Sequence, residues 1–267
     1  IVLGFIGHIK YQSLVVLPYL LIRRRWRALT STIVSAAAFA LSTAAVFGWD
    51  RNAEYLRRGV GGLGRLFGEP AVEGAANIFP ITWIRSISVT STIARFQEWA
   101  DLPAWSLPAM VLVAAGAALA AVLLLYKARG CSLFLRRDRT HDMTSPRAHA
   151  LVAVEWAGMI TAVLVFGPQT TARHMVLLVP LVSMAAMLLV VPRSGIRRPP
   201  ILAATVFLLL AFVLPPGSGD DTPALHTWRA VGGISIATLT LLYITIAAAL
   251  RWSASMPDTP DTPDTAT

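Results

Sequence analysis

Seven apolar stretches, separated by loops whose positive charge alternates from one loop to the next, constrain this chain more than any other feature. Several approach the ~20 residues that an α-helix needs to cross ~30 Å of hydrocarbon. Because backbone groups in lipid must be satisfied within the segment, such stretches form helices. The stretches are Tyr11–Ile22, Leu29–Gly48, Leu107–Tyr126, Ala148–Phe166, Met175–Val191, Ile201–Leu214 and Val231–Leu250. They predict an all-α polytopic membrane protein, a bundle of about 6–7 transmembrane helices.

The composition agrees with a membrane protein and disfavours other classes. Hydrophobic residues make up 55% of the chain and charged residues 14%, whereas a soluble domain carries about a quarter charged residues. The net charge of +9 lies in short clusters between apolar stretches, so we expect no nucleic-acid partner. A single cysteine, Cys131, excludes an internal disulfide, and the scattered histidines predict no metal site and no cofactor.

Positive loops stay cytoplasmic, which predicts the orientation of the chain. The basic clusters lie at 23–27, 127–147 and 193–198, and the loops between them are neutral, weakly basic or acidic. The segment Trp49–Trp105 is then outside and the C-terminus is cytoplasmic. We expect one transmembrane domain over residues 1–252, followed by a disordered cytoplasmic tail at 253–267, which is a polar Pro/Asp/Thr repeat.

The outer segment 49–105 carries helical signals of its own. An apolar face at Trp49, Ala53, Leu56 and Val60 predicts an amphipathic helix lying in the membrane interface. A second helix is predicted from Thr82 to about Glu98. Tryptophans at the ends of spans are typical of an interfacial aromatic belt. The candidates are Trp83, Trp99 and Trp105. Ordinary loop packing is the alternative.

Three polar sites at membrane depth are candidates for chemistry. Lys10 interrupts the first apolar sequence, and a helix break there would place it at an outward-facing, water-filled turn. The short turn Gly167–His174 gathers Arg173, whose guanidinium suits phosphate, and His174, which can shuttle a proton. An ordinary hairpin is the alternative for this turn. Glu155 lies about two turns inside a predicted span, where a functional role and snorkelling to the interface are both open.

Three segments together resemble GT-C membrane glycosyltransferases, most closely glycosyltransferase family 87. The first is GFIGHIKYQSLVVLPYLLIRRRWRAL, the second is FGWDRNAEYL, and the third is VLVFGPQTTARHMVLLVPL, with His174 in the family's histidine position. The resemblance covers about Gly4 to Val191. Tyr11 and Gly167 depart from it, because they replace the family's usual Pro and Ser.

The resemblance implies transfer of a sugar, most often mannose, from a polyprenyl-phosphate donor to a lipid-linked or glycan acceptor. The reaction would occur on the outer face of a bacterial inner membrane, among membrane lipids and without a nucleotide sugar. The resemblance also implies an inverting displacement with a catalytic aspartate in the first outer loop. We expect that residue upstream of Ile1, so the chain would be a C-terminal fragment. The implied substrate-binding residues are Lys10, Gln12, Gln169, Arg173 and His174, with His174 also a catalytic candidate.

Two other functions compete with this interpretation. A transporter or lipid flippase would need a polar path and paired internal repeats, and the sequence contains no convincing repeat. A non-catalytic scaffold would leave Lys10, Arg173 and His174 without a role.

Overall fold

The computed structural model describes residues 16–64, 80–131, 133, 146–168, 170–191, 196–213 and 223–255. Every regular element in these ranges is a helix, which confirms the all-α prediction. The chain divides into two compact units, Ile1–Ile81 and Thr82–Thr267, and each is described by itself. The expected single domain over residues 1–252 stays a prediction.

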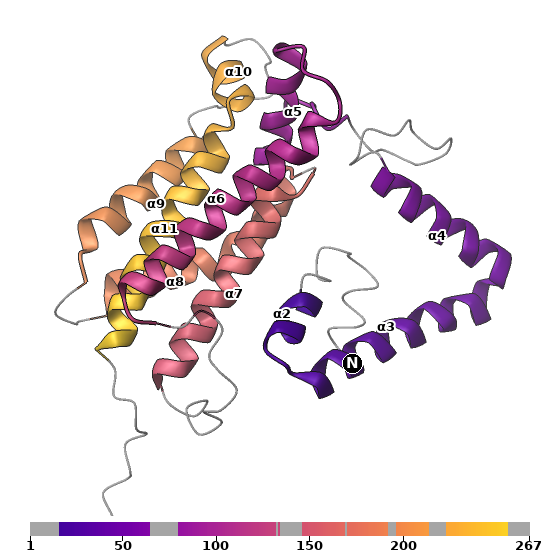
Figure 1. Ribbon diagram of the computed structural model, residues 1–267, viewed down its shortest axis with the longest axis horizontal. Coiled ribbons are helices and arrows are strands. Elements are labelled where there is room, and N and C mark those ends of the chain that lie inside the picture. Colours follow the sequence, from indigo (N-terminus) through magenta and orange to yellow (C-terminus); the bar gives the residue numbers. More distant parts are fainter. Residues whose placement is uncertain are drawn as a thin grey trace, which may run out of the picture. The chain divides into compact units, whose positions relative to one another are not determined.

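In its described residues the first unit contains three helices, α2 (Val16–Ile22), α3 (Trp26–Phe47) and α4 (Trp49–Gly64) (Figure 1). With 22 residues, α3 is long and apolar enough to cross a membrane. It ends at Gly48, whose φ of 86° lies in a region that glycine enters without steric cost, so the chain can turn directly into α4.

Helix α4 confirms the predicted amphipathic helix but packs through a polar residue. Asn52 is 8% exposed, its side-chain oxygen accepts a hydrogen bond from Thr43 Oγ1 at 2.9 Å, and its Nδ2 donates to the Ala40 carbonyl at 3.3 Å. Trp49, at the start of the predicted apolar face, is exposed. An amide directed at α3 therefore joins the two helices.

The second unit is a helical bundle with two short helices at one end. It contains α5 (Val89–Trp99), α6 (Ser106–Ala128), α7 (Pro146–Phe166), the 3₁₀ helix η4 (Ala172–Leu178), α8 (Val179–Val190), α9 (Arg198–Val213), α10 (Pro223–Ala230) and α11 (Gly233–Ala254). Figure 1 shows the long helices side by side, with α5 and α10 together at one end. Five described helical segments could span a membrane by length and apolarity, namely α3, α6, α7, η4 with α8, and α11, while α9 is shorter.

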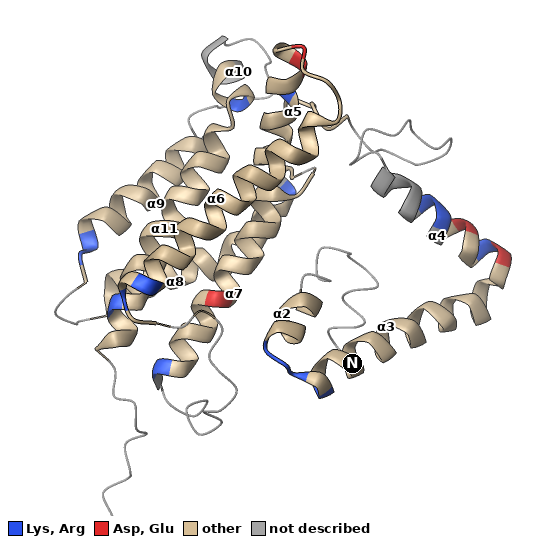
Figure 2. Cartoon of the chain, in the orientation of Figure 1, with Lys and Arg blue, Asp and Glu red and all other residues tan. Residues whose placement is uncertain are grey.

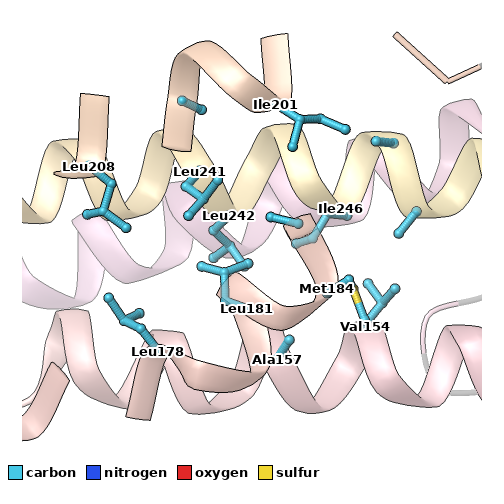
Figure 3. Packing of buried hydrophobic residues seen from close by; sticks show 14 of the residues in the cluster. Val154, Ala157, Leu178, Leu181, Met184, Ile201, Leu208, Leu241, Leu242 and Ile246 are labelled. Carbon is cyan, nitrogen blue, oxygen red and sulfur yellow. The ribbon is translucent and has the colours of Figure 1, made fainter. Parts of the chain in front are cut away.

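Helix α11 forms the centre of this bundle, packed against α6, α7, α8 and α9. Leu241, Leu242 and Ile246 meet apolar residues of the neighbouring helices (Figure 3). Small hydroxyl residues, such as Thr238 and Thr245, are also buried along it. Such small residues let helix backbones approach closely. Close packing matters in a membrane, because acyl chains are as apolar as the side chains and the hydrophobic effect does not drive helices together.

Helix α6 covers the outside of the bundle. Its apolar residues Leu112, Val113 and Leu124 are exposed, as lipid-facing side chains must be. The Tyr243 hydroxyl of α11 donates to the Ala118 carbonyl at 3.1 Å and so attaches α6 near its middle.

Basic residues gather at the end of the second unit opposite α5 and α10 (Figure 2). In the described part of the second unit these are Lys127, Arg129, Arg147, Arg197, Arg198 and Arg251, whereas Arg85, Arg95, Arg173 and Arg229 lie toward the other end. This distribution agrees with the charge clusters that underlie the predicted orientation. The side that faces the cytoplasm stays a prediction.

Several helix boundaries differ from the sequence-based predictions, and one helix was not expected. Helix α5 begins at Val89 rather than Thr82, because the Ser88 hydroxyl caps it by accepting from the Ser91 amide at 3.1 Å. The stretch 175–191 opens as a 3₁₀ helix, because Pro180 has no amide hydrogen and its ring excludes a preceding α-helical turn. Helix α10 was not expected. Helix α11 includes Ser253, which is buried, so the predicted tail starts too early.

Candidate functional site

The turn between α7 and η4 is built around a glycine and a buried threonine. Gly167 follows α7, and its amide donates to the Val163 carbonyl at 2.8 Å. A Cβ on Gly167 would lie 2.6 Å from that carbonyl oxygen, so no larger residue fits this conformation. Thr170 is 2% exposed, and its hydroxyl donates to the Leu164 carbonyl at 2.5 Å. Thr170 is thus held over the end of α7.

A cluster of small hydroxyl residues before and within α5 holds this turn. We call Ser86, Ser88, Thr90 and Ser91 the hydroxyl cluster. Thr90 Oγ1 donates to the Phe166 carbonyl at 2.7 Å and Ser91 Oγ to the Pro168 carbonyl at 3.0 Å. The Ile87 amide donates to the Thr170 carbonyl at 2.7 Å.

Burial makes these contacts consequential. Ser86, Ser88 and Ser91 are each 0% exposed, and a buried polar group that loses its partner costs about 1–3 kcal/mol. Within the cluster, the Ser88 hydroxyl donates to Ser91 Oγ at 3.0 Å. The Ser91 hydroxyl also lies 2.7 Å from Ser86 Oγ. The turn 167–171 is therefore part of a hydrogen-bonded unit with α5 and is no free hairpin.

His174 has a structural role through one of its two ring nitrogens. Its Nδ1 accepts from the Thr171 amide at 3.1 Å and lies 3.2 Å from Thr171 Oγ1, in a capping box at the start of η4. Because a backbone amide can only donate, Nδ1 carries no proton in this arrangement, and the network assigns the hydrogen to Nε2. Sequence reasoning gave His174 a chemical role alone, and the cap is an additional one.

Arg173 differs from its neighbour in having an exposed side chain. In the described ranges it makes no hydrogen bond and no ion pair. Its guanidinium is a fixed fork of five donors that matches phosphate or carboxylate. A cation next to a turn that several hydrogen bonds hold can bind an anionic group with less loss of backbone entropy than one on a free loop.

Arg95 forms a second cationic feature at this end of the bundle, and its donors are fully used. Nε donates to the Ala230 carbonyl at 3.2 Å. Nη1 donates to the Trp83 and Ser86 carbonyls at 3.1 and 3.3 Å. Nη2 donates to Thr92 Oγ1 at 3.1 Å and to the Arg229 carbonyl at 3.0 Å.

These five acceptors match the five hydrogens of a guanidinium, so Arg95 joins parts of the protein and has no donor left for a ligand. Burial lowers the pKa of Arg95 from its ordinary value. Arginine nevertheless stays protonated in proteins, so the positive charge remains next to the carbonyls that end α10. Such a charge is favourable at a helix C-terminus.

The remaining candidates are only partly visible. Lys10, Gln12 and Gln169 lie outside the described residues, so their convergence with His174 stays a prediction. Glu155 is 5% exposed within α7, and its role stays open. In the described ranges no group of three or more His, Cys, Asp or Glu residues could hold a metal ion.

The sequence-based reasoning missed the hydroxyl cluster and Arg95. Five hydroxyl residues in the run SISVTST, 86–92, were a usable signal, because Ser and Thr concentrate at helix N-termini. The partners of Arg95 at residues 229 and 230 had no signal, since they lie far along the chain.

Comparison with known proteins gives one match. The profile of glycosyltransferase family 87 matches residues 1–144, which is more than half of the chain. No curated protein and no solved structure matches it. The matched region contains α2 to α6, and the turn 167–174 follows it. Because this profile covers more than half of the chain and the chain has several apolar spans, we conclude that it is a multi-pass membrane protein that belongs to glycosyltransferase family 87.

Proposed function

We propose that this membrane glycosyltransferase moves a sugar, mannose in the simplest case, from a polyprenyl-phosphate donor to a hydroxyl of a lipid-linked or glycan acceptor. The family supports glycosyl transfer and the need for a donor and an acceptor. The resemblance of the motifs around Lys10 and His174 supports the lipid-phosphate donor and a reaction on the outer face of a bacterial inner membrane.

The observation that carries the proposal is an exposed arginine directly after a turn that is hydrogen-bonded to α5. Arg173 lies in the first turn of η4, directly after the turn held by the hydroxyl cluster, and its guanidinium has no partner in the described part of the chain. We propose that it binds the phosphate of the donor. Hydrogen bonds between ionised partners are roughly twice as strong as neutral ones. Lys10, Gln12 and Gln169 complete the proposed site from the sequence, and His174 contributes its Nε2–H.

The proposed reaction is an inverting displacement at the anomeric carbon. A bond forms between the acceptor oxygen and that carbon, and the bond from the carbon to the phosphate oxygen breaks. The acceptor proton passes to a carboxylate base, for which no residue of this chain is proposed. The negative charge that develops on the departing lipid phosphate is stabilised by Arg173 and Lys10.

Two replacements of His174 distinguish its role as a helix cap, through Nδ1, from its proposed role in the reaction, through Nε2–H. The amide of His174→Asn can accept from the Thr171 amide in place of Nδ1 but has no group at the position of Nε2. His174→Ala loses both. We expect both variants to lose transfer from polyprenyl-phosphate mannose in isolated membranes, and only His174→Ala to lose thermal stability. Full transfer by His174→Asn would mean that the histidine is a cap alone.

Arg173 is tested by changing the form of its charge. Arg173→Lys retains the charge but not the planar fork, and we expect transfer to fall by about 10²-fold, as for a lost oxyanion donor. Arg129→Ala, an exposed arginine just past the end of α6, serves as the control and should retain activity. Normal transfer by both Arg173→Lys and Arg173→Ala would exclude Arg173 from the site. Movement of the intact donor from one leaflet of a vesicle membrane to the other, without transfer of its sugar, would support a flippase instead.

A further inference from the structure

An exposed aromatic surface connects the C-terminal half of α5 to the start of α6. The aromatic and apolar side chains in this stretch are Phe96 (47% exposed), Trp99 (82%), Leu102 (39%) and Trp105 (74%). The rings of Phe96 and Trp99 lie 6.0 Å apart between centroids. We call these four residues the aromatic edge.

The aromatic edge has a defined backbone, although it includes the turn 100–105. Gln97 Nε2 donates to the Leu102 carbonyl at 3.3 Å and to the Pro103 carbonyl at 2.8 Å. The Leu102 amide donates back to the Gln97 carbonyl at 3.0 Å. Asp101 adopts a φ of 50°, the left-handed conformation that Asp tolerates better than most residues. The backbone that carries the four side chains of the aromatic edge is therefore held in a defined turn.

The position of the aromatic edge points to its occupant. Trp105 directly precedes α6, a 23-residue apolar helix with exposed Leu112 and Val113 about two turns further along. The edge therefore continues the surface that lipid covers and lies at the end of a span, where the hydrocarbon gives way to headgroups. Tryptophan is enriched at that depth because its ring is apolar and its N–H is polar.

The charges around the edge favour a neutral lipid surface over an acidic partner. The sequence from 96 to 105 contains Glu98 and Asp101 and no Lys or Arg. Both acidic side chains are exposed. Two exposed carboxylates disfavour a densely anionic partner such as nucleic acid, whereas zwitterionic headgroups and water accommodate isolated carboxylates.

We propose that Phe96, Trp99, Leu102 and Trp105 insert into the headgroup region of the bilayer and anchor α5 in the membrane interface. The opposite side of α5 carries Thr90, Ser91 and Ala94 into the protein, where Ser91 and Thr90 hold the turn 167–171. The 11-residue helix α5 thus joins the lipid surface to the turn 167–171, which leads directly to Arg173 in η4. The anchor sets the depth of that turn relative to the lipid phosphates. This inference deepens the proposed function, but the anchor can be tested without any transfer assay.

Spin labels measure the insertion directly. The full chain, with Cys131→Ser, would be reconstituted into nanodiscs of phosphatidylcholine, where both membrane faces are accessible. A nitroxide is attached at Trp99→Cys and, separately, at Trp105→Cys, and collisions with oxygen and with a water-soluble nickel chelate are compared. Glu98→Cys is the matched control, because it is exposed on the same helix about 100° around from Trp99.

The inserted edge predicts a ratio of oxygen to nickel collisions severalfold higher at positions 99 and 105 than at position 98. Equal, nickel-dominated collisions at all three positions would place the edge in water and overturn the proposal. Low collision rates with both reagents at 99 and 105 would mean that protein covers the edge, either another part of this chain or a second copy, and would also overturn it. Insertion at 99 and 105 with normal transfer by Arg173→Ala would uphold the anchor while refuting the proposed donor site.

Discussion

Replacing Arg95 with alanine tests whether one side chain holds the α5 end of the second unit together. In the native protein its guanidinium joins three features, namely the turn at Trp83 and Ser86, the side chain of Thr92 and the last carbonyls of α10. The alanine variant leaves all five acceptors without their donor. It also removes the positive charge from the C-terminus of α10.

The size of the effect follows from the environment of these acceptors. A hydrogen bond to a charged group contributes about 1.5–3 kcal/mol, and such contributions are not additive within one network. Arg95 is only half-buried, so water can replace several of the lost donors, and the desolvation of the guanidinium is recovered. We therefore expect a loss of about 2–4 kcal/mol, well below the sum of five bonds. At about 2–4 °C per kcal/mol, unfolding should occur roughly 5–15 °C lower.

The measurement is the thermal unfolding of purified protein in detergent, followed by the loss of the monodisperse peak. Arg95→Lys retains the charge with three donors instead of five, and it should fall between the wild type and Arg95→Ala. Arg129→Ala removes an exposed arginine at the other end of the bundle and serves as the control. If Arg95→Ala and Arg129→Ala unfold at the same temperature, the five hydrogen bonds do not stabilise the fold and the reasoning fails.

Three further predictions concern the glycine before α11, the contact between α3 and α4, and the orientation. Gly232→Ala and Gly130→Ala both force alanine into a left-handed conformation at a cost of about 1–2 kcal/mol, but only at position 232 would a Cβ meet another residue, at 2.5 Å from Thr92 Oγ1. Gly232→Ala should therefore lower the unfolding temperature further, and equal effects would argue against the close contact. Asn52→Ala should cost about 1–2 kcal/mol and speed tryptic cleavage in α4, whereas the exposed Ser42→Ala should not; unchanged cleavage would mean that the amide does not hold α4. With Cys131 replaced, an impermeant thiol reagent should label a cysteine at Gly62 and not at Ser132 in intact cells, and the reverse pattern would invert the orientation.

The membrane spans could be predicted because hydropathy is a local property of the sequence. Each of α3, α6, α7 and α11 is long and apolar enough to be recognised as a span from the sequence alone. Boundaries were less accurate where a single residue decides them. Ser88 caps α5 and moves its start by seven residues, and Pro180 delays α8. Both residues are visible in the sequence, but the predicted helix starts did not take them into account.

The organisation of the candidate site could be predicted only in part. The turn Gly167–His174 was identified as a concentration of polar residues, since Arg and His next to each other at a span end are conspicuous. Its attachment to α5 depends on pairs such as Thr90 with Phe166, which lie 76 residues apart. The burial of Asn52 was also unexpected, because an apolar face predicts contact with lipid and says nothing about an amide that meets a neighbouring helix.

The central position of α11 has a consequence for how the protein is made. Helices α6, α7, α8 and α9 all pack on it, yet it follows all four of them in the sequence. At ~5–20 residues per second, a ribosome needs on the order of 10 s to proceed from the end of α7 to the end of α11. During that interval the faces of α6, α7, α8 and α9 that will pack on α11 are exposed to lipid or to the insertion machinery. The four helices therefore complete their packing only after α11 is made, and a chain that stops before Gly233 would leave them without their common partner.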